Sequence, residues 1–275
     1  MTETATEPPV TGTERPRRRG VWIAVAAATA FTAIVPLGEQ AWGRLFRQTE
    51  TVPAVSYAHA ITALEVEAGS GSVTVGTGPP GRVAVGRTLR WTLGKPNVGQ
   101  SWNGDTLVIK ADCGAHATLF SGPGCDVDLN VRVPAGITVR ATVSSGTITA
   151  QGLAGPVRLQ ARSGSVNIAR THGPVWARAN SGSVNGTDLS SPQVDVGTSS
   201  GAVGLGFADA PQQVTAKATS GSVTVALPRG FRYRVNGTSS SGDLRVDDGL
   251  RDDGSSHRIE VSTRSGAARV RYGPS

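Results

Sequence analysis

Only two cysteines, Cys113 and Cys125, occur in the 275 residues, and their spacing allows more than one chemistry. In an oxidising compartment two such thiols usually form a disulfide. Here it would close a Gly-rich loop of about twelve residues and add about 3 kcal/mol in the chain-entropy model. The alternatives are two free thiols, or a metal site with Asp112 and His116, for which a single C-x-x-H pair is a weak signal. We predict the disulfide, no metal ion and no cofactor.

A second pattern has a catalytic interpretation. Residues 197 to 201 read GTSSG, which fits the G-x-S-x-G pattern of hydrolase nucleophile elbows. Such an elbow needs a strand, a sharp turn and a following helix. Residues 202 to 205 alternate like another strand instead, so we predict a turn between two strands and no catalytic residue.

Carboxylates are concentrated in one segment near the C-terminus. Four of them within seven residues could supply oxygen ligands to Ca²⁺, which takes six to eight. No EF-hand spacing is present, so a solvated loop is the simpler interpretation, and calcium binding stays open. The four are Asp247, Asp248, Asp252 and Asp253.

Basic residues recur at alternate positions, where they would point outward from strands. Residues 39 to 275 contain 23 basic and 17 acidic residues, a net charge of +6. If the strands stack, eight of the basic residues form a stripe that could hold an anionic wall polymer, lipid phosphates or an acidic partner. A solubilising face, interleaved with Asp195 and Glu260, is the alternative. The predicted stripe consists of Arg158, Arg162, Arg178, Lys217, Arg232, Arg234, Arg258 and Arg264.

The strands that would position these residues follow from an internal repeat. Ser-Gly recurs before alternating apolar residues, with successive spacings of 18, 18, 19, 20, 21 and 24 residues between glycines. Such a period indicates stacked coils that share one core. Glycine suits the turns because it reaches positive φ at no Cβ cost. The repeated glycines are Gly146, Gly164, Gly182, Gly201, Gly221, Gly242 and Gly266, with an earlier copy at Gly71.

Each repeat holds a second alternating strand, such as Val157-Leu159-Ala161 or Phe231-Tyr233-Val235. Period-two alternation predicts one buried and one exposed face. Aromatic residues make up only 5% of the chain, so the core must consist of small aliphatic side chains. We therefore predict an all-β fold, a parallel β-solenoid of coils of about 18–24 residues, with a twisted open stack or a β-sandwich as the alternatives. Residues 60 to 140 are less regular and would form an atypical first layer.

The N-terminus carries the signals of a membrane anchor. Arg15, Arg17, Arg18 and Arg19 precede an uncharged stretch from Gly20 to Gly38. Within it the seventeen residues from Val21 to Leu37, apolar except for two Thr, would span roughly 26 Å as a helix, the short end of a membrane crossing. The positive-inside rule places the arginines in the cytoplasm. A cleaved signal peptide and a buried soluble helix are the alternatives, and the first of these also exports the remaining chain.

The expected organisation is therefore a cytoplasmic arm (1–19), a transmembrane helix (20–38), a stalk (39–58) and one extracytoplasmic β-solenoid domain (59–275). The Ser-Gly-Ser-Val steps at Ser163–Val166, Ser181–Val184 and Ser220–Val223, with VDLNVRVPAG at Val127–Gly136, carry a family resemblance. Over about residues 60 to 275 the chain resembles the "putative adhesin" or β-strand-repeat domains of bacterial envelope proteins, and the toastrack-type domains of envelope-stress proteins. The resemblance implies this fold and transfers no catalytic residue.

Together these features favour a single-pass membrane protein of the bacterial cell envelope. Its expected function is that of a non-catalytic structural or binding module, whose partners are the membrane and an anionic wall polymer or an envelope protein. An envelope-stress sensor that acts through a membrane partner is the alternative, and a polysaccharide-cleaving enzyme is less favoured. The exported location argues against nucleic acid as a partner.

Overall fold

The computed structural model describes residues 47–92, 94–114 and 124–273. Arg47–Ser275 form one compact unit. The predicted cytoplasmic arm and transmembrane helix lie outside the described residues. None of the residues that are described belongs to a helix with the length and apolar character needed to cross a membrane.

The all-β prediction is confirmed, because the described residues form eighteen strands that belong to one hydrogen-bonded sheet. The strands of the N-terminal half are β1 (Gln48–Tyr57), β2 (Ala63–Thr77), β3 (Val83–Trp91), β4 (Asn97–Asn103), β5 (Thr106–Asp112), β6 (Cys125–Val133), β7 (Thr138–Gln151), β8 (Val157–Ala169) and β9 (Val175–Ser181). Those of the C-terminal half are β10 (Val184–Leu189), β11 (Gln193–Ser200), β12 (Val203–Phe207), β13 (Gln213–Ser220), β14 (Val223–Leu227), β15 (Arg234–Ser241), β16 (Leu244–Val246), β17 (Arg258–Ser265) and β18 (Ala268–Tyr272).

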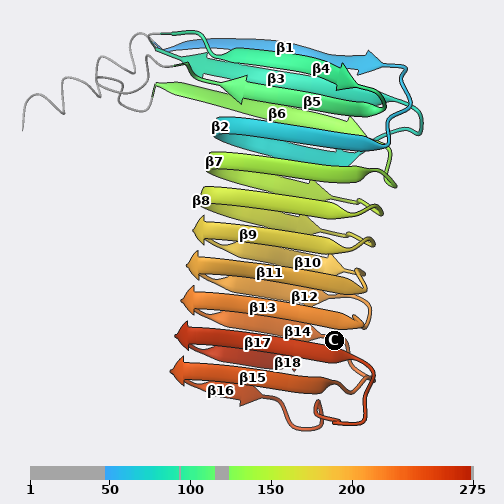
Figure 1. Cartoon of the computed structure of the whole chain (residues 1–275), viewed down its shortest axis with the longest axis vertical. Coiled ribbons are helices and arrows are strands. Elements are labelled where there is room, and N and C mark those ends of the chain that lie inside the picture. The colour runs from blue at the N-terminus through green and yellow to red at the C-terminus, as the bar shows by residue number, and fades with distance from the viewer. Residues whose placement is uncertain (1–46, 93, 115–123, 274–275) are drawn as a thin grey trace, which may run out of the picture. The chain divides into compact units, whose positions relative to one another are not determined.

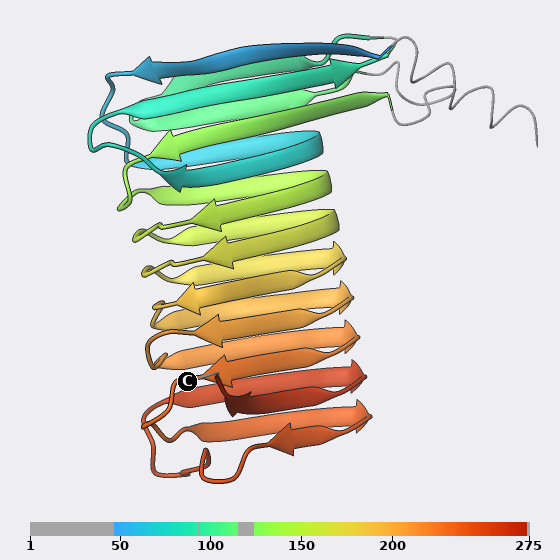
Figure 2. The same cartoon turned by 180° about the vertical axis from the view of Figure 1, so that it is seen from behind.

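From β7 onward the chain forms coils of two strands that meet at a Ser-Gly corner and stack in parallel register, as the repeats predict (Figure 1). Figure 2 shows β2, β7 and β8 turning this corner without a break. One face of the stack, called the charged face below, consists of the first halves of β2, β7 and β8 together with β5, β9, β11, β13, β17 and β15. The opposite face consists of the second halves of β2, β7 and β8 together with β6, β10, β12, β14, β18 and β16.

The repeated glycines form a column at the corner, which explains why no other residue occurs there. Gly164 has a φ of +137° and stacks directly on Gly146, so that a Cβ on Gly164 would lie well inside contact distance of the Gly146 carbonyl oxygen. The same is true of Gly182 on Gly164. Glycine is therefore required both for the positive φ and for the close approach of successive backbones.

Small aliphatic side chains fill the space between the two faces. One inward column contains Val157, Val175 and Val194 in direct register, all nearly fully buried. At the corner the inward residue can be threonine, because its hydroxyl finds a partner: Thr198 Oγ1 donates to the Gly182 carbonyl at 2.8 Å and Thr263 Oγ1 to that of Gly221 at 3.0 Å. Aligned columns of this kind give the stack a continuous core.

The N-terminal layer is antiparallel and includes part of the predicted stalk. Strand β2 stacks in parallel on β7, and on β5 and β6 at its other edge. Beyond them β3 pairs with β6, β1 with β3 and β4 with β5, all antiparallel. The stalk prediction for 39–58 is therefore wrong over β1, which belongs to the sheet. Pro53 and a bulge between Val52 and Val55 interrupt this edge strand, a common protection against further pairing.

The other end of the stack departs from sequence order. The last coil, β17–β18, lies between β13–β14 and β15–β16, so the chain skips one layer and returns to fill it (Figure 1). Gly266 accordingly stacks on Gly221, and Gly242 on Gly266. The long final spacing of 24 residues is explained by this return, since residues 247 to 257 carry the chain back across a layer.

Residues before β15 close the end of the core. The alternation at Phe231, Tyr233 and Val235 predicted a strand there, but β15 begins only at Arg234 and Phe231 is 45% exposed. Tyr233 and Leu250 are fully buried, and the Tyr233 N–H donates to the Leu250 carbonyl at 2.8 Å. These two side chains cover the terminal coil, β15–β16, beyond which the described residues form no further layer.

Candidate functional site

The cysteines form the predicted disulfide. Cys113 follows β5 and Cys125 begins β6, and their Cα atoms are 5.9 Å apart. A thiolate metal site is excluded because both sulfur atoms are in the disulfide bond, while His116 lies outside the described residues. The disulfide links the first strands of the two faces next to β2.

The acidic segment acts as a turn in the described structure. The Asp252 carboxylate accepts from the Gly254 N–H at 2.9 Å, and that of Asp247 accepts from the Tyr272 N–H at 3.1 Å. Within the described ranges no three Asp, Glu, His or Cys side chains gather as a metal site would require. The segment is the connection that returns the chain to the inserted coil.

The G-x-S-x-G segment is also structural, as predicted. Gly197 to Ser200 belong to β11, Gly201 forms the corner with a φ of +143°, and β12 follows. A strand takes the place of the helix that a nucleophile elbow needs.

The predicted basic stripe is spread over several parallel columns of the charged face. Arg158 lies in one column, Arg178 and Lys217 in the next, and Arg162 and Arg264 in a third. Arg258 and Arg234 are neighbours in a further column, and Arg232 precedes β15 outside any strand. The face is therefore basic without being one continuous stripe.

Carboxylates neutralise part of this face. Arg178 lies 2.8 Å from Asp195, and Lys217 lies 2.8 Å from Glu260. Both pairs join residues on adjacent strands, the geometry in which opposite charges stabilise a sheet. Two of the eight predicted ligand residues are thus engaged within the protein.

Arg158 is held in a different way. Its guanidinium carbon lies 4.0 Å from the centre of the Trp176 ring, and that of Arg178 lies 4.8 Å from it. Trp176 is the register partner of Arg158 on β9. Stacking on an aromatic ring restrains a guanidinium while its N–H groups remain able to bind an anion.

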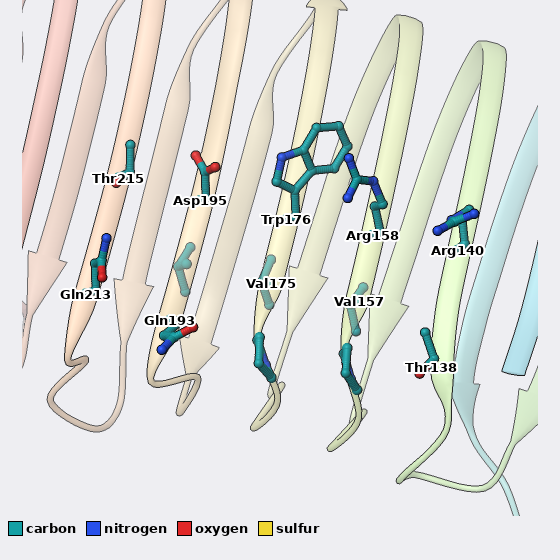
Figure 3. A pocket seen from close by; sticks show the side chains of 13 residues that line it. Thr138, Arg140, Val157, Arg158, Val175, Trp176, Gln193, Asp195, Gln213 and Thr215 are labelled. Carbon is teal, nitrogen blue, oxygen red and sulfur yellow. The ribbon is translucent and has the colours of Figure 1, made fainter. Parts of the chain in front are cut away.

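A shallow groove of about 400 Å³ crosses the charged face along the axis of the stack (Figure 3). It lies between two outward columns, over Val157, Val175 and Val194. The residues of one wall are Arg140, Arg158, Trp176, Asp195 and Thr215. Those of the other wall are Thr138, Pro156, Pro174, Gln193 and Gln213.

Sequence reasoning missed Arg140, which precedes the first recognised repeat. It is the register partner of Arg158 on β7 and lies 3.8 Å from Glu65. The alternation of Val139, Ala141 and Val143 before Gly146 is the signal that could have revealed it. Gln193 and Gln213 were missed because nothing in a sequence marks an outward amide as part of a wall.

The opposite face of the same coils has another character. On this face the first two outward positions after each corner glycine, in the second halves of β7 and β8 and at β10, β12 and β14, are small and uncharged. These residues are Thr147, Thr149, Ser165, Asn167, Ser183, Asn185, Ala202, Gly204, Ser222 and Thr224. Charge and aromatic surface in the middle of the stack are thus concentrated on the groove side.

Asp128, which lies outside the groove, has a shifted pKa. Burial raises the pKa of this carboxyl, but hydrogen bonds from Ser72 and the charge of Arg90 outweigh it and hold the pKa below its ordinary value. Asp128 lies on β6 and Ser72 on β2, so the pair fastens the antiparallel layer to the first coil.

Comparison with known proteins gives a family and remote structural likenesses. A family model described as "Toastrack DUF4097" matches residues 46–272. None of the curated proteins compared with the chain matches it in sequence. A "putative cell adhesion protein" from Clostridium sporogenes ATCC 15579 is 12% identical, with 82% of this chain and 100% of that chain covered and a TM-score of 0.36.

Two structures from Parabacteroides distasonis ATCC 8503 are similar to the same extent. A "putative adhesin" is 14% identical, with 81% of this chain and 97% of that chain covered and a TM-score of 0.39. A "putative lipid binding protein" is 12% identical, with 83% and 97% covered and a TM-score of 0.36. The family model extends over nearly all of the described residues, from the strand β1 that precedes the repeats to the inserted last coil. The chain therefore belongs to the Toastrack DUF4097 family.

Proposed function

We propose that this protein is a membrane-anchored, extracytoplasmic and non-catalytic binding module of the bacterial cell envelope, which holds an anionic ligand on its charged face. One observation carries the proposal. Within the strands from β7 to β14 the outward basic residues all lie on the charged face, while the first outward positions of the opposite face are uncharged. A merely solubilising charge distribution has no reason to favour one face.

Two features support the location. A disulfide is typical of exported proteins, because cytosolic thiols are kept reduced. The uncharged segment 20–38 follows four arginines, as in an anchor whose N-terminus is cytoplasmic. The ligand-binding domain would then face the envelope.

The arrangement of the acids favours binding over catalysis. Glu65, Glu67, Asp195 and Glu260 on the charged face each lie within 4 Å of a basic group. Hydrolysis of a glycosidic bond typically requires one carboxyl group to donate a proton and another to act as base or nucleophile. Carboxylates held in ion pairs along a rigid sheet suit a surface that positions charge.

The location is tested on the full chain in cells. We expect it to stay in the membrane fraction after alkaline carbonate extraction and to be digested by protease added to spheroplasts. Its mobility on a non-reducing gel should shift when reductant is added. A chain that is released by carbonate, or is protected from external protease, would contradict this part of the proposal.

Binding is tested by retention of the full chain, in nonionic detergent, on native wall and membrane fractions. We expect retention to fall steeply as salt rises, since surface charge interactions are screened. The variant Arg158→Gln/Arg162→Gln/Arg264→Gln should lose it. The variant Arg245→Gln/Arg269→Gln/Arg271→Gln removes the same charge from the opposite face and should keep it. Equal behaviour of the two variants would remove the charged face as the binding surface.

A further inference from the structure

Arg140 and Arg158 form one of the two arginine pairs in direct register on the charged face, and unlike Arg234 and Arg258 they line the groove. They are register partners on adjacent strands β7 and β8, where like charges destabilise a sheet. Elsewhere on this face Arg178 and Lys217 each have a carboxylate at 2.8 Å. The carboxylate nearest to Arg140 is 3.8 Å away, and among the described residues none lies within 4.0 Å of Arg158. Among the described residues the pair thus has one carboxylate, Glu65, for two guanidinium groups.

The two guanidinium groups stand at one end of the groove (Figure 3). Arg158 is restrained against Trp176, with its guanidinium carbon 4.0 Å from the ring centre. A restrained guanidinium loses less entropy when it binds an anion, and it can donate two parallel hydrogen bonds to one carboxylate or phosphate. This end of the groove is suited to a negatively charged group.

The rest of the groove is suited to a neutral, hydroxyl-rich chain. Beyond Trp176, the amides of Gln193 and Gln213 can both donate and accept hydrogen bonds. The rings of Pro156 and Pro174 supply apolar surface on the second wall. The groove crosses β7, β8, β9, β11 and β13, which at about 4.8 Å per strand gives a length of roughly 19 Å.

We propose that this groove binds a linear acidic polysaccharide that lies along the stack axis, with an anionic group of the polymer at Arg140 and Arg158. This inference rests on the proposed function and names the ligand class of the same face. A lipid headgroup would use only the arginine end, whereas an extended glycan uses the amides and prolines as well. Trp176 holds Arg158 in place and lines the groove beside the neighbouring sugar.

The test measures binding of a defined oligogalacturonate to the full chain in nonionic detergent by calorimetry. The same oligomer with methyl-esterified carboxyls is the neutral probe, and phosphatidylglycerol vesicles are the lipid probe. We expect the acidic oligomer to bind at least about tenfold more tightly than its ester, because charge-assisted hydrogen bonds are the stronger ones. Its affinity should fall as salt rises.

Two pairs of variants locate the site. Arg140→Gln/Arg158→Gln should lower the affinity for oligogalacturonate at least about tenfold. Arg245→Gln/Arg269→Gln removes two register partners of the opposite face and should leave the affinity unchanged. Gln193→Ala/Gln213→Ala should lower the affinity for oligogalacturonate without changing the affinity for vesicles. Thermal unfolding of each variant shows that the fold is intact.

The inference is overturned if Arg140→Gln/Arg158→Gln binds as the wild type does, or if the ester binds equally well. It is also overturned if the phosphatidylglycerol vesicles bind and Gln193→Ala/Gln213→Ala weakens the binding of neither probe. That result would indicate that the ligand is a lipid phosphate. If oligogalacturonate does not bind while retention on envelope fractions remains salt-sensitive, this inference fails and the proposed function stands. If retention is absent too, both fail.

Discussion

The middle coils and the last two coils are built from the same repeat but assembled differently. From β7 to β14 each coil stacks on the one before it in sequence. At the end, β17–β18 is inserted between β13–β14 and β15–β16. The repeat therefore specifies the shape of a coil, while the neighbours of that coil are decided by something else.

The difference in apolar surface explains the inserted coil. Ile259, Val261 and Val270 point into the core and are almost fully buried. In β15 the residues in register with Ile259 and Val261 are the less apolar Val235 and Gly237, and Leu244 and Val246 of β16 are only partly buried. Placing the more apolar coil inside and the more polar one at the end buries more apolar area. Terminal repeats with polar outer surfaces are typical of solenoids.

Deletion of residues 258–275 should destabilise the end of the stack more than any other change considered for the two last coils. Without β17–β18 the coil β15–β16 loses its hydrogen-bonded neighbour, and the edges of β13 and β14 are exposed. We expect a loss of several kcal/mol of stability and of amide protection throughout β15, measured by hydrogen exchange. A chain that ends at Gly273 is the control. Retained protection in β15, through direct pairing with β13, would show that the inserted coil is not needed to order the end.

Gly164→Ala tests the corner of the middle coils. The new Cβ would meet the Gly146 backbone, and the φ of +137° is unfavourable for alanine, so we expect a loss of about 3 kcal/mol or more. Gly136→Ala is the matched control, because no atom lies within 4 Å of its Cβ position and its φ is not positive. Denaturant unfolding should separate the two variants, and equal midpoints would contradict the account of the corner.

Val261→Ala and Val246→Ala sharpen the comparison between the inserted and terminal coils. Each change removes two methyl groups, worth about 0.8 kcal/mol each when buried. With the cavity term we expect Val261→Ala to cost about 2–3 kcal/mol. Val246 is only partly buried, so its loss should stay below about 1 kcal/mol. Similar costs in thermal unfolding would mean that the two coils are equally packed.

Tyr233→Phe should have the smallest effect. The buried Tyr233 hydroxyl has no hydrogen-bond partner among the described residues, so its removal should leave stability unchanged or raise it by about 1 kcal/mol. Burial, with a smaller effect of Tyr272, raises the pKa of Tyr233 to about 12. The wild type should therefore lose stability between about pH 10 and pH 12, because in this range the Tyr233 hydroxyl ionises in the unfolded chain but not in the folded one.

The variant lacks that ionisation, so its stability should fall less over the same pH range. Chemical unfolding of both proteins at pH 8 and pH 11 checks this. A marked loss of stability in Tyr233→Phe at pH 8 would instead reveal a hydrogen bond to this hydroxyl.

Much of the fold could be predicted from the repeat because each of its features has a local cause. The glycine column follows from positive φ, and the buried columns follow from period-two alternation of small apolar residues. The disulfide was predicted from two cysteines in a chain that its N-terminal segment led us to expect outside the cytoplasm. Strand β1 could not be predicted in this way, since its alternation is weak and its partner β3 lies about thirty residues away.

The sequence alone determined the coil, its core and its basic character, because these depend on the type and period of neighbouring residues. Only the tertiary structure decided which coil lies beside which, and so which side chains share a column. Arg140 meets Arg158 and Arg178 meets Asp195 through register between strands, which no local pattern encodes. The groove is a property of that register, because its walls come from five strands of the stack.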